Sequence, residues 1–301
     1  MPNQAVADVV ARLKSGGQPA DLQGWRSQFD AVAGGQPMPD DARFQPIILG
    51  GVPAERVTVA AAEEPGVVMF FHGGGYMFGS SLAYRALTAI LAAATRAPLL
   101  AINYRLAPEH PFPAAVEDTT AAYRAILESG TPASRIGFAG DSAGGGLVIA
   151  TMLSARDAGL PMPAAGYGIS PWLDLSCEGK SFTELAAVDQ LMTADGARGC
   201  AAAYLQGSDA RHPWASPVHA DFTGQPPLML QVGSTEMFLD DSTRAARTAA
   251  LAGVHVEMQV WPGMPHVWHL WPSILPEAVA ALAAGGRFLR ERLTPSLTQA
   301  M

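Results

Sequence analysis

The segment Phe138–Ala150, FAGDSAGGGLVIA, places a serine between glycines at the junction of two apolar stretches. The residues before the serine, SRIGFAG, read as a strand, and those after it, GGLVIATMLSARDAG, read as a helix. Gly-x-Ser-x-Gly in this context is typical of a nucleophile elbow, a turn so sharp that only small residues fit two positions either side of the serine. Gly140 and Gly144 occupy those positions. The segment therefore predicts that Ser142 is a nucleophile at a helix N-terminus, with a plain glycine-rich turn as the alternative.

The alternation of strand and helix continues on both sides of this turn. Strand-like segments include GVVMFFHGGG, APLLAINYRL, PPLMLQVG and VHVEMQVWPG, and helix-like segments such as DDSTRAARTAALAG lie between them. Nearly continuous apolar strands that alternate with helices indicate a parallel sheet covered on both faces. We therefore expect an α/β fold with a mostly parallel central sheet of about eight strands flanked by helices.

Two regions break this alternation. Residues 1–45 hold two helix-like segments followed by GGQPMPDDARFQP, which reads as a loop because of its Gly, Pro and Asp content. Residues 180–224 hold further helix-like pieces and read as an insertion after a strand. We expect both regions to form a helical cap over the carboxyl ends of the strands, where open α/β sheets bind ligands. The catalytic core is then formed by residues 46–179 and 225–301.

Composition limits the classes of function. The net charge of −8 argues against a nucleic-acid or anionic-membrane partner, because both favour basic patches. The two cysteines, Cys177 and Cys200, lack the spacing of a metal site or a disulfide framework, so we expect them to be small apolar filling residues. The N-terminus lacks the pattern of a signal peptide, and no apolar stretch reaches the ~18 residues of a membrane span. We therefore expect a cytoplasmic protein without stable membrane insertion.

A glycine loop upstream of the serine, HGGG at residues 72–75, follows the strand VVMFF. Acyl transfer through a serine creates a tetrahedral oxyanion, which needs pre-aimed hydrogen-bond donors. Glycines let backbone N–H groups approach a substrate without interference from side chains. We expect the donors to be the N–H groups of Gly74, Gly75 and Ala143, with Gly73 as a further candidate. His72 is expected to brace this loop.

A serine nucleophile needs a base, and in hydrolases of this design the chain order is serine, acid and then histidine. His266 follows the strand EMQVW and the turn PGMP, so it lies at the end of a strand. We therefore prefer His266 to His269, which reads as a helix-start or surface residue.

The acid is expected on the loop after the preceding strand, PPLMLQVG. Glu236 lies three residues past the end of that strand, and Asp240 comes one helical turn later. We place Glu236 first and keep Asp240 as the alternative, because Asp240 and Asp241 read as helix N-terminal charges. Asp141 is a poor choice because the turn at the serine points it elsewhere.

HGGG, NYRLAPEHPFPAAVED, GDSAGGGL, ASPVHADFTGQPPLMLQVG and PGMPHVW together resemble the hormone-sensitive-lipase-like esterases, bacterial family IV, over roughly residues 45–295. The resemblance implies a capped α/β-hydrolase fold and carboxylesterase activity on short- to medium-chain acyl esters. By motif it implies Ser142 as nucleophile, His266 as base and Glu236 as acid. The family's acid is usually Asp in a D-x-L-x-D segment. Here Glu236 stands at its first place, which keeps Asp240 a competitor.

We therefore expect a carboxylesterase that acts on a small-molecule ester without a metal or an organic cofactor. The resemblance also implies a homodimer paired through an edge strand. An amidase or lactonase on the same site is the first alternative, and a non-catalytic relative that binds a small apolar ligand is the second. An interfacial lipase is disfavoured because no long apolar lid is evident.

Two further groups of residues have a structural reading, and for the second group a place in the pocket wall is an equal alternative. In NYRLAPEHPFPAAVED, four polar side chains are expected to tie a proline-rich crossover against the sheet: Tyr104, Arg105, Glu109 and Asp118. Six large apolar side chains are expected either to line a pocket under the cap or to form the cap's core: Trp25, Phe29, Met38, Met192, Tyr204 and Trp214.

Overall fold

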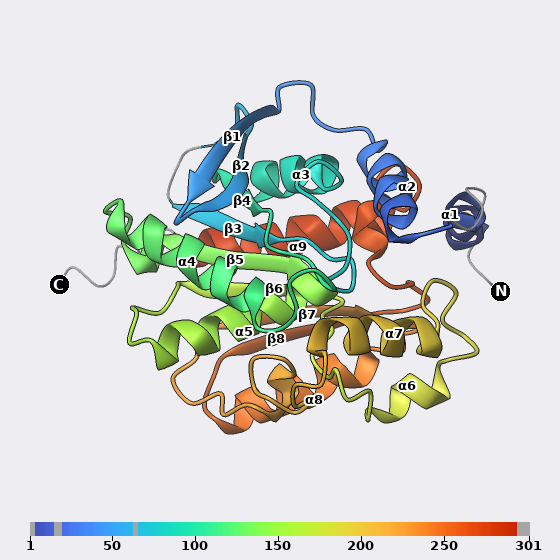
Figure 1. Cartoon of the computed structure of the whole chain (residues 1–301). Helices are drawn as coiled ribbons and strands as arrows, with labels where there is room; N and C mark the ends of the chain where they lie inside the picture. The colour runs from blue at the N-terminus through green and yellow to red at the C-terminus, as the bar shows by residue number, and fades with distance from the viewer. Residues whose placement is uncertain (1–3, 15–19, 63–65, 294–301) are drawn as a thin grey trace.

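The computed structural model describes residues 4–14, 20–62 and 66–293. Across these residues, eight strands form one sheet in the order β1-β2-β4-β3-β5-β6-β7-β8 (Figure 1). The β1–β2 and β2–β4 pairs are antiparallel and the other pairs are parallel, so the predicted fold class is confirmed. The strands are β1 (Arg43–Leu49), β2 (Val52–Thr58), β3 (Val67–Phe71), β4 (Leu99–Ile102), β5 (Ile136–Asp141), β6 (Ala165–Ile169), β7 (Leu228–Gly233) and β8 (Val256–Trp261).

Helices cover both faces of the sheet. Helices α3 and α9 pack together on one face, and α4, α5 and α8 lie on the other (Figure 1). Every residue of β3, β5, β6 and β7 is buried, as the continuous apolar runs of their sequences predict. The helices on the two faces are α3 (Arg85–Thr95), α4 (Ala114–Glu128), α5 (Ala143–Asp157), α8 (Leu239–Leu251) and α9 (Pro276–Leu293), with short 3-10 helices η1 (Ala133–Arg135), η2 (Pro217–His219) and η3 (Trp268–Leu270).

The expected loop at GGQPMPDDARFQP is shorter than the sequence analysis predicted, because β1 begins within it. The last four residues of GGQPMPDDARFQP belong to this strand, so the expected boundary between residues 45 and 46 falls inside it. Gly50 and Gly51 connect β1 to β2 and have φ values of +57° and +84°. Two residues with positive φ form the turn that suits the twist of antiparallel strands, and Gly adopts this conformation without a Cβ penalty. The Gly-Gly pair was thus a hairpin signal that the sequence analysis missed.

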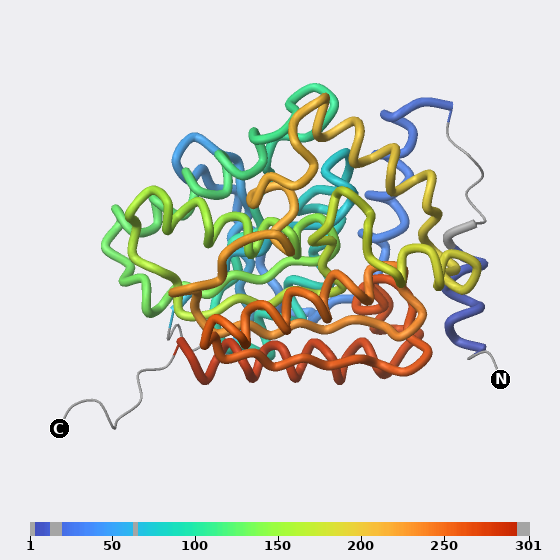
Figure 2. Tube along the Cα trace, turned by 90° about the horizontal axis from the view of Figure 1, so that it is seen from below, coloured from blue at the N-terminus to red at the C-terminus, as the bar shows by residue number. Residues whose placement is uncertain are grey.

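Four helices gather at one end of the molecule: α1 (Gln4–Lys14), α2 (Leu22–Gly34), α6 (Lys180–Glu184) and α7 (Ala194–Leu205). Figures 1 and 2 both place them at the same end, although residue 34 and residue 180 are far apart in the chain. The side chain of Asp21 caps α2 by accepting a hydrogen bond from the Gly24 N–H at 2.8 Å. No helix within the described ranges is both long and apolar enough to cross a membrane.

Arg26 attaches α2 to the rest of the protein. Its guanidinium donates two 2.7 Å hydrogen bonds to Glu109 and further bonds to the carbonyls of Met77 and Ala107. A bidentate pair fixes both orientation and distance. Glu109 therefore ties the crossover segment to α2, whereas the sequence analysis expected it to hold that segment against the sheet.

The other polar residues of the crossover behave as expected. Asp118 accepts hydrogen bonds from the Arg105 backbone at 2.8 Å and from the Arg105 guanidinium at 2.9 Å. The Tyr104 hydroxyl donates to the His72 carbonyl at 2.7 Å. The Asp118 bonds hold the crossover against α4, and the Tyr104 bond attaches it to the residue after β3, at the start of the glycine loop.

Candidate active site

Ser142 lies at the tight turn between β5 and α5. Its φ of +51° and ψ of −119° are uncommon for a residue with a side chain, and such strain is found at functional sites. A Cβ added to Gly140 would lie 2.4 Å from the Gly144 carbonyl oxygen, and one added to Gly144 would lie 1.9 Å from that of Phe71. Both positions therefore accept only glycine, which is the geometry predicted for a nucleophile elbow.

The Gly144→Ala variant is expected to destabilise the protein by more than about 3 kcal/mol, because the added Cβ meets fixed backbone atoms of β3. Gly199→Ala is the control, since nothing lies within 4 Å of its added Cβ and Ala is the better residue inside a helix. Urea unfolding of the two variants measures the difference. A Gly144→Ala midpoint equal to that of the wild type would contradict the close packing of the elbow.

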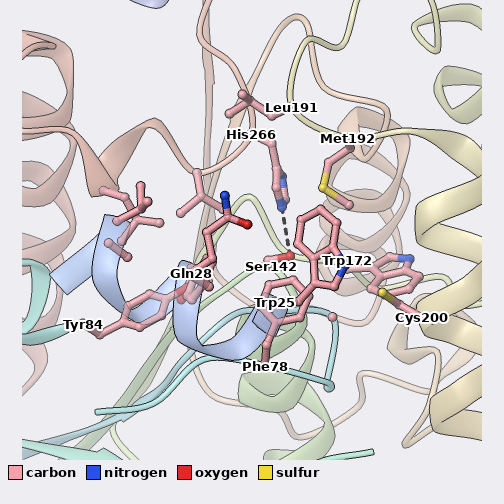
Figure 3. Close-up of a pocket in the computed structure, with 18 of the residues that line it drawn as sticks. Trp25, Gln28, Phe78, Tyr84, Ser142, Trp172, Leu191, Met192, Cys200 and His266 are labelled. Atoms are coloured by element: carbon pink, nitrogen blue, oxygen red, sulfur yellow. Dashed lines mark hydrogen bonds between the residues drawn. The ribbon is translucent and has the colours of Figure 1, made fainter. Parts of the chain in front are cut away.

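The three residues predicted to act together each follow the carboxyl end of a strand, at the same edge of the sheet. Ser142 follows β5, Glu236 follows β7 and His266 follows β8. The Nε2 atom of His266 is 2.9 Å from Ser142 Oγ (Figure 3). Its Nδ1 atom is 2.8 Å from Glu236 Oε2. Because a carboxylate can only accept, Nδ1–H donates to Glu236 and Nε2 accepts the hydroxyl proton of Ser142. This is the hydrogen-bond order required for proton removal from a serine.

Two more donors hold the Glu236 carboxylate. Its Oε1 atom accepts from the Ser170 hydroxyl at 2.7 Å and from the Gly233 N–H at 2.6 Å. Ser170 has a φ of +43° and its Oγ also accepts from the Val267 N–H at 3.1 Å, so it joins the acid to the residue after His266. Sequence reasoning missed Ser170, because its only signal was a serine at the end of a strand.

The alternative acid, Asp240, lies in a different set of contacts. Its Oδ2 accepts from the Ser181 N–H at 3.0 Å, and its own N–H donates to Ser181 Oγ at 2.8 Å. These bonds join the start of α8 to α6. Asp241 accepts instead from the N–H groups of Leu173 and Asp174.

The alternative base, His269, is fully buried and lies away from the serine. Its Nε2 donates to Gln231 Oε1 at 2.9 Å, and burial holds the pKa of the imidazole well below its usual value. His269 lies in the first turn of the short helix η3, as one reading of the sequence expected, but the expectation of a surface residue was wrong, because it is fully buried. A neutral, buried imidazole of this kind is part of the packing.

Gly74, Gly75 and Ala143, the residues expected to supply the oxyanion donors, lie close to Ser142 in the fold. Gly74 and Gly75 line the cavity at Ser142 and have φ values of +113° and +59°, while Ala143 is the first residue of α5. Gly73 differs from them, because its N–H donates to Asp141 Oδ1 at 2.8 Å and also lies 3.1 Å from the Tyr84 hydroxyl. The Gly73 N–H is thus already hydrogen-bonded within the protein, although the sequence analysis named it as a further candidate donor to the oxyanion.

Comparison with known proteins gives the family. A family model for the alpha/beta hydrolase fold matches residues 68–270. An acetyl-hydrolase of Streptomyces hygroscopicus is 46% identical over 251 residues, which cover 80% of this chain and 84% of that protein. The crystal structure of an esterase from the bacterial hormone-sensitive lipase family has a TM-score of 0.94 at 40% identity, over 97% of this chain and 99% of that one. The chain belongs to the hormone-sensitive-lipase-like esterases, bacterial family IV.

Further relatives agree with this family and its activity. An esterase of Acinetobacter venetianus is 33% identical over 248 residues, 82% of each chain. The structure of EstE5 soaked with p-nitrophenyl butyrate has a TM-score of 0.91 at 40% identity, over 97% of this chain and 99% of that one. The protein is a carboxylesterase of the α/β-hydrolase fold.

In this esterase the charge of Glu236 changes the basicity of His266. Burial alone lowers the pKa of the imidazole, but the hydrogen bond and charge of Glu236 raise it, and the net pKa lies above its usual 6.5. A base must be unprotonated to accept a proton, so the arrangement provides a stronger base that becomes available at higher pH.

His72 and Asp141 hold the glycine loop of the esterase from two sides. The His72 ring stacks on Tyr104 at 4.3 Å, and its Nδ1 donates to the Gly73 carbonyl at 2.8 Å. Burial lowers the pKa of His72 to about 4, so the ring is neutral near pH 7. Asp141 Oδ2 accepts from the Tyr84 hydroxyl at 2.7 Å, and burial raises the pKa of Asp141 to about 7. His72 makes the contacts expected of a brace.

A cavity of about 230 Å³ opens beside Ser142 (Figure 3). Helix α2 and the segment that contains α7 both contribute to its wall, which is mainly apolar. Three of the six predicted side chains line it: Trp25, Phe29 and Met192. The other three pack elsewhere: Met38, Tyr204 and Trp214. Cys200 also lines the cavity, so it is more than the filling residue that the sequence suggested.

Proposed function

We propose that the esterase hydrolyses short- to medium-chain acyl esters through a Ser142–His266–Glu236 triad and a covalent acyl-enzyme. The observation that carries the proposal is the continuous chain of hydrogen bonds from Glu236 through His266 to Ser142. A nucleophile, a base within reach of its proton and an acid that orients the base are together the requirement for nucleophilic catalysis by serine.

In the first half of the proposed reaction, Ser142 Oγ attacks the ester carbonyl while His266 Nε2 takes its proton. The carbonyl oxygen becomes an oxyanion, which accepts hydrogen bonds from the N–H groups of Gly74, Gly75 and Ala143. Glu236 stabilises the imidazolium that forms. His266 then gives its proton to the leaving alcohol, and the acyl group remains on Ser142.

In the second half, water replaces the alcohol. His266 removes a proton from the water, the hydroxide attacks the acyl carbonyl, and the same three N–H groups bind the second oxyanion. The bond between the acyl carbon and Ser142 Oγ breaks, Oγ regains its proton from His266, and the carboxylic acid leaves.

The cavity supports a small acyl group. Its volume of about 230 Å³ is below the roughly 300–1,000 Å³ of pockets that enclose drug-sized ligands. Aromatic and aliphatic side chains form its wall, including Trp25, Phe78 and Met192 (Figure 3). The p-nitrophenyl butyrate soaked into EstE5 crystals carries an acyl group of this class.

A series of p-nitrophenyl esters tests the chain length. We expect kcat/KM to be highest between the acetate and the octanoate and to fall by about ten-fold or more for the palmitate, because a long chain cannot be enclosed. The rates should be measured below the solubility limit of each ester. A preference for the palmitate would contradict the proposal and favour an interfacial lipase.

We also propose that α1, α2, α6 and α7 form the cap of this esterase. The pocket supports this, because residues of α2 and of the segment that contains α7 both line the cavity beside Ser142. The homodimer and the cytoplasmic location expected from the sequence stay predictions.

A further inference from the structure

Asp189 joins two segments that the reaction needs but that lie far apart in the sequence. It is in the insertion between α6 and α7, and the residue is 9% exposed. Its Oδ1 atom accepts 3.0 Å hydrogen bonds from the N–H groups of Leu191 and Met192. Its Oδ2 atom accepts a 3.0 Å bond from the N–H of Met237, the residue after Glu236.

The first pair of bonds is the pattern of a local turn. Asp side chains often accept from N–H groups two and three residues later, and one oxygen is sufficient for this. The turn gives no reason for the second oxygen to reach Met237, 48 residues away. Hydrogen bonds to a carboxylate are stronger than those to a neutral acceptor, so this contact fixes the distance between the two segments.

Each segment has a part in the proposed reaction. Leu191 and Met192 line the cavity beside Ser142 (Figure 3). Met237 continues the loop on which Glu236 holds His266. A shift at Asp189 therefore reaches the pocket wall on one side and the acid on the other.

We propose that Asp189 is a positioning residue of this esterase, whose single carboxylate sets the pocket wall at Leu191 and Met192 and fixes the acid loop at Met237. The inference rests on the function proposed above. It adds a specificity residue that contacts neither Ser142 nor His266 through a hydrogen bond.

The charge of Asp189 also acts on His266. Four titratable groups interact electrostatically with the imidazole: Glu236, Asp189, Asp141 and His269. The three carboxylates raise the pKa of His266, and the charge of His266 in turn lowers the pKa of His269. Burial lowers the pKa of His266, Glu236 raises it most, and Asp189 and Asp141 raise it further. Loss of the Asp189 charge therefore lowers this pKa, and the rise of kcat/KM with pH moves to lower pH.

The test compares Asp189→Asn with the wild type across the ester series and across pH. The amide keeps the size of the side chain but loses the charge and one acceptor oxygen. We expect kcat/KM about 10–100-fold lower, since small misplacements at a site have effects of this order. We also expect an altered order of preference among acyl chains and an acid limb at lower pH.

Two further variants separate the effects. Asp195→Asn makes the same change of charge on an exposed side chain in the first turn of α7, so it should change neither profile. Asp189→Glu keeps the charge but moves the acceptors, so the acid limb should stay near that of the wild type while the acyl preference still changes. If Asp189→Asn does not fold, the inference is tested by comparing the acyl-chain preference of Asp189→Glu with that of the wild type.

The opposite results overturn the inference. An Asp189→Asn enzyme that is only less heat-stable, with the wild-type acyl preference and pH profile, would show a merely structural role. Hydrogen exchange at the Met237 amide gives a readout without activity, and it should be faster in Asp189→Asn. If the wild type hydrolyses no ester, the proposed function is wrong. If hydrogen exchange at the Met237 amide is the same in Asp189→Asn as in the wild type, Asp189 does not fix the acid loop at Met237.

Discussion

The Ser142→Ala variant is expected to lose about 10⁶-fold in kcat for ester hydrolysis, because members of a catalytic triad act as a unit. Without Oγ no acyl-enzyme can form, and His266 has no hydroxyl to deprotonate. The residual rate would come from the oxyanion donors and from binding alone. The fold should survive, since Ala removes one atom from a side chain whose residue is 6% exposed at the cavity.

Three measurements make this result decisive. Hydrolysis of p-nitrophenyl butyrate gives the rate, thermal unfolding shows that the variant is folded, and a fluorophosphonate probe reports the nucleophile directly. Ser129→Ala, on the surface at the end of α4, is the matched control and should be labelled and active like the wild type. Unchanged hydrolysis by Ser142→Ala would remove the serine from the mechanism, and an unlabelled wild type would favour a binding protein.

The elbow at Ser142 could be predicted because its causes are local. Gly140 and Gly144 are required within five residues of chain, and the strand and helix around them have clear apolar patterns. His266 and Glu236 could be placed from chain order, since the carboxyl ends of parallel strands meet at one edge of the sheet.

The residues that support the site could not be predicted in the same way. Ser170 is 66 positions from Glu236, and Asp189 is 48 positions from Met237. A single serine or aspartate in a loop gives no signal of a partner at that separation. Their roles depend on which loops the sheet order brings together, and this is known only once the fold is known.

The pocket wall was predictable only in part for a related reason. Trp25 and Phe29 face the cavity, whereas Tyr204 stacks on Tyr76 at 3.8 Å inside the core. Both environments are apolar, so composition and helical spacing fit either of them. The difference lies in which face of each helix meets another element, and the sequence pattern does not contain that information.

The choice between Glu236 and Asp240 gives the second large effect. We expect Glu236→Gln to lower kcat by about 10⁴-fold, the order of loss when the orienting acid of a triad becomes an amide. The carboxylate accepts from His266, Ser170 and the Gly233 N–H, and an amide has only one oxygen for these donors. Its NH₂ group must then face a donor, which turns the imidazole away or stabilises its wrong tautomer.

Asp240→Asn is the comparison because it makes the same change in the competing acid. Asp240 bonds to Ser181 and holds α6 against α8, so its loss should lower thermal stability and leave kcat within about ten-fold of the wild type. Glu236→Asp adds a test of length, since the family's usual acid is shorter by one methylene. The acid loop of this chain fits the longer arm, so Asp at this position should recover only part of the loss. A larger loss of kcat in Asp240→Asn than in Glu236→Gln would assign the acid to Asp240, and the 2.8 Å contact of Glu236 with His266 would then have no catalytic part.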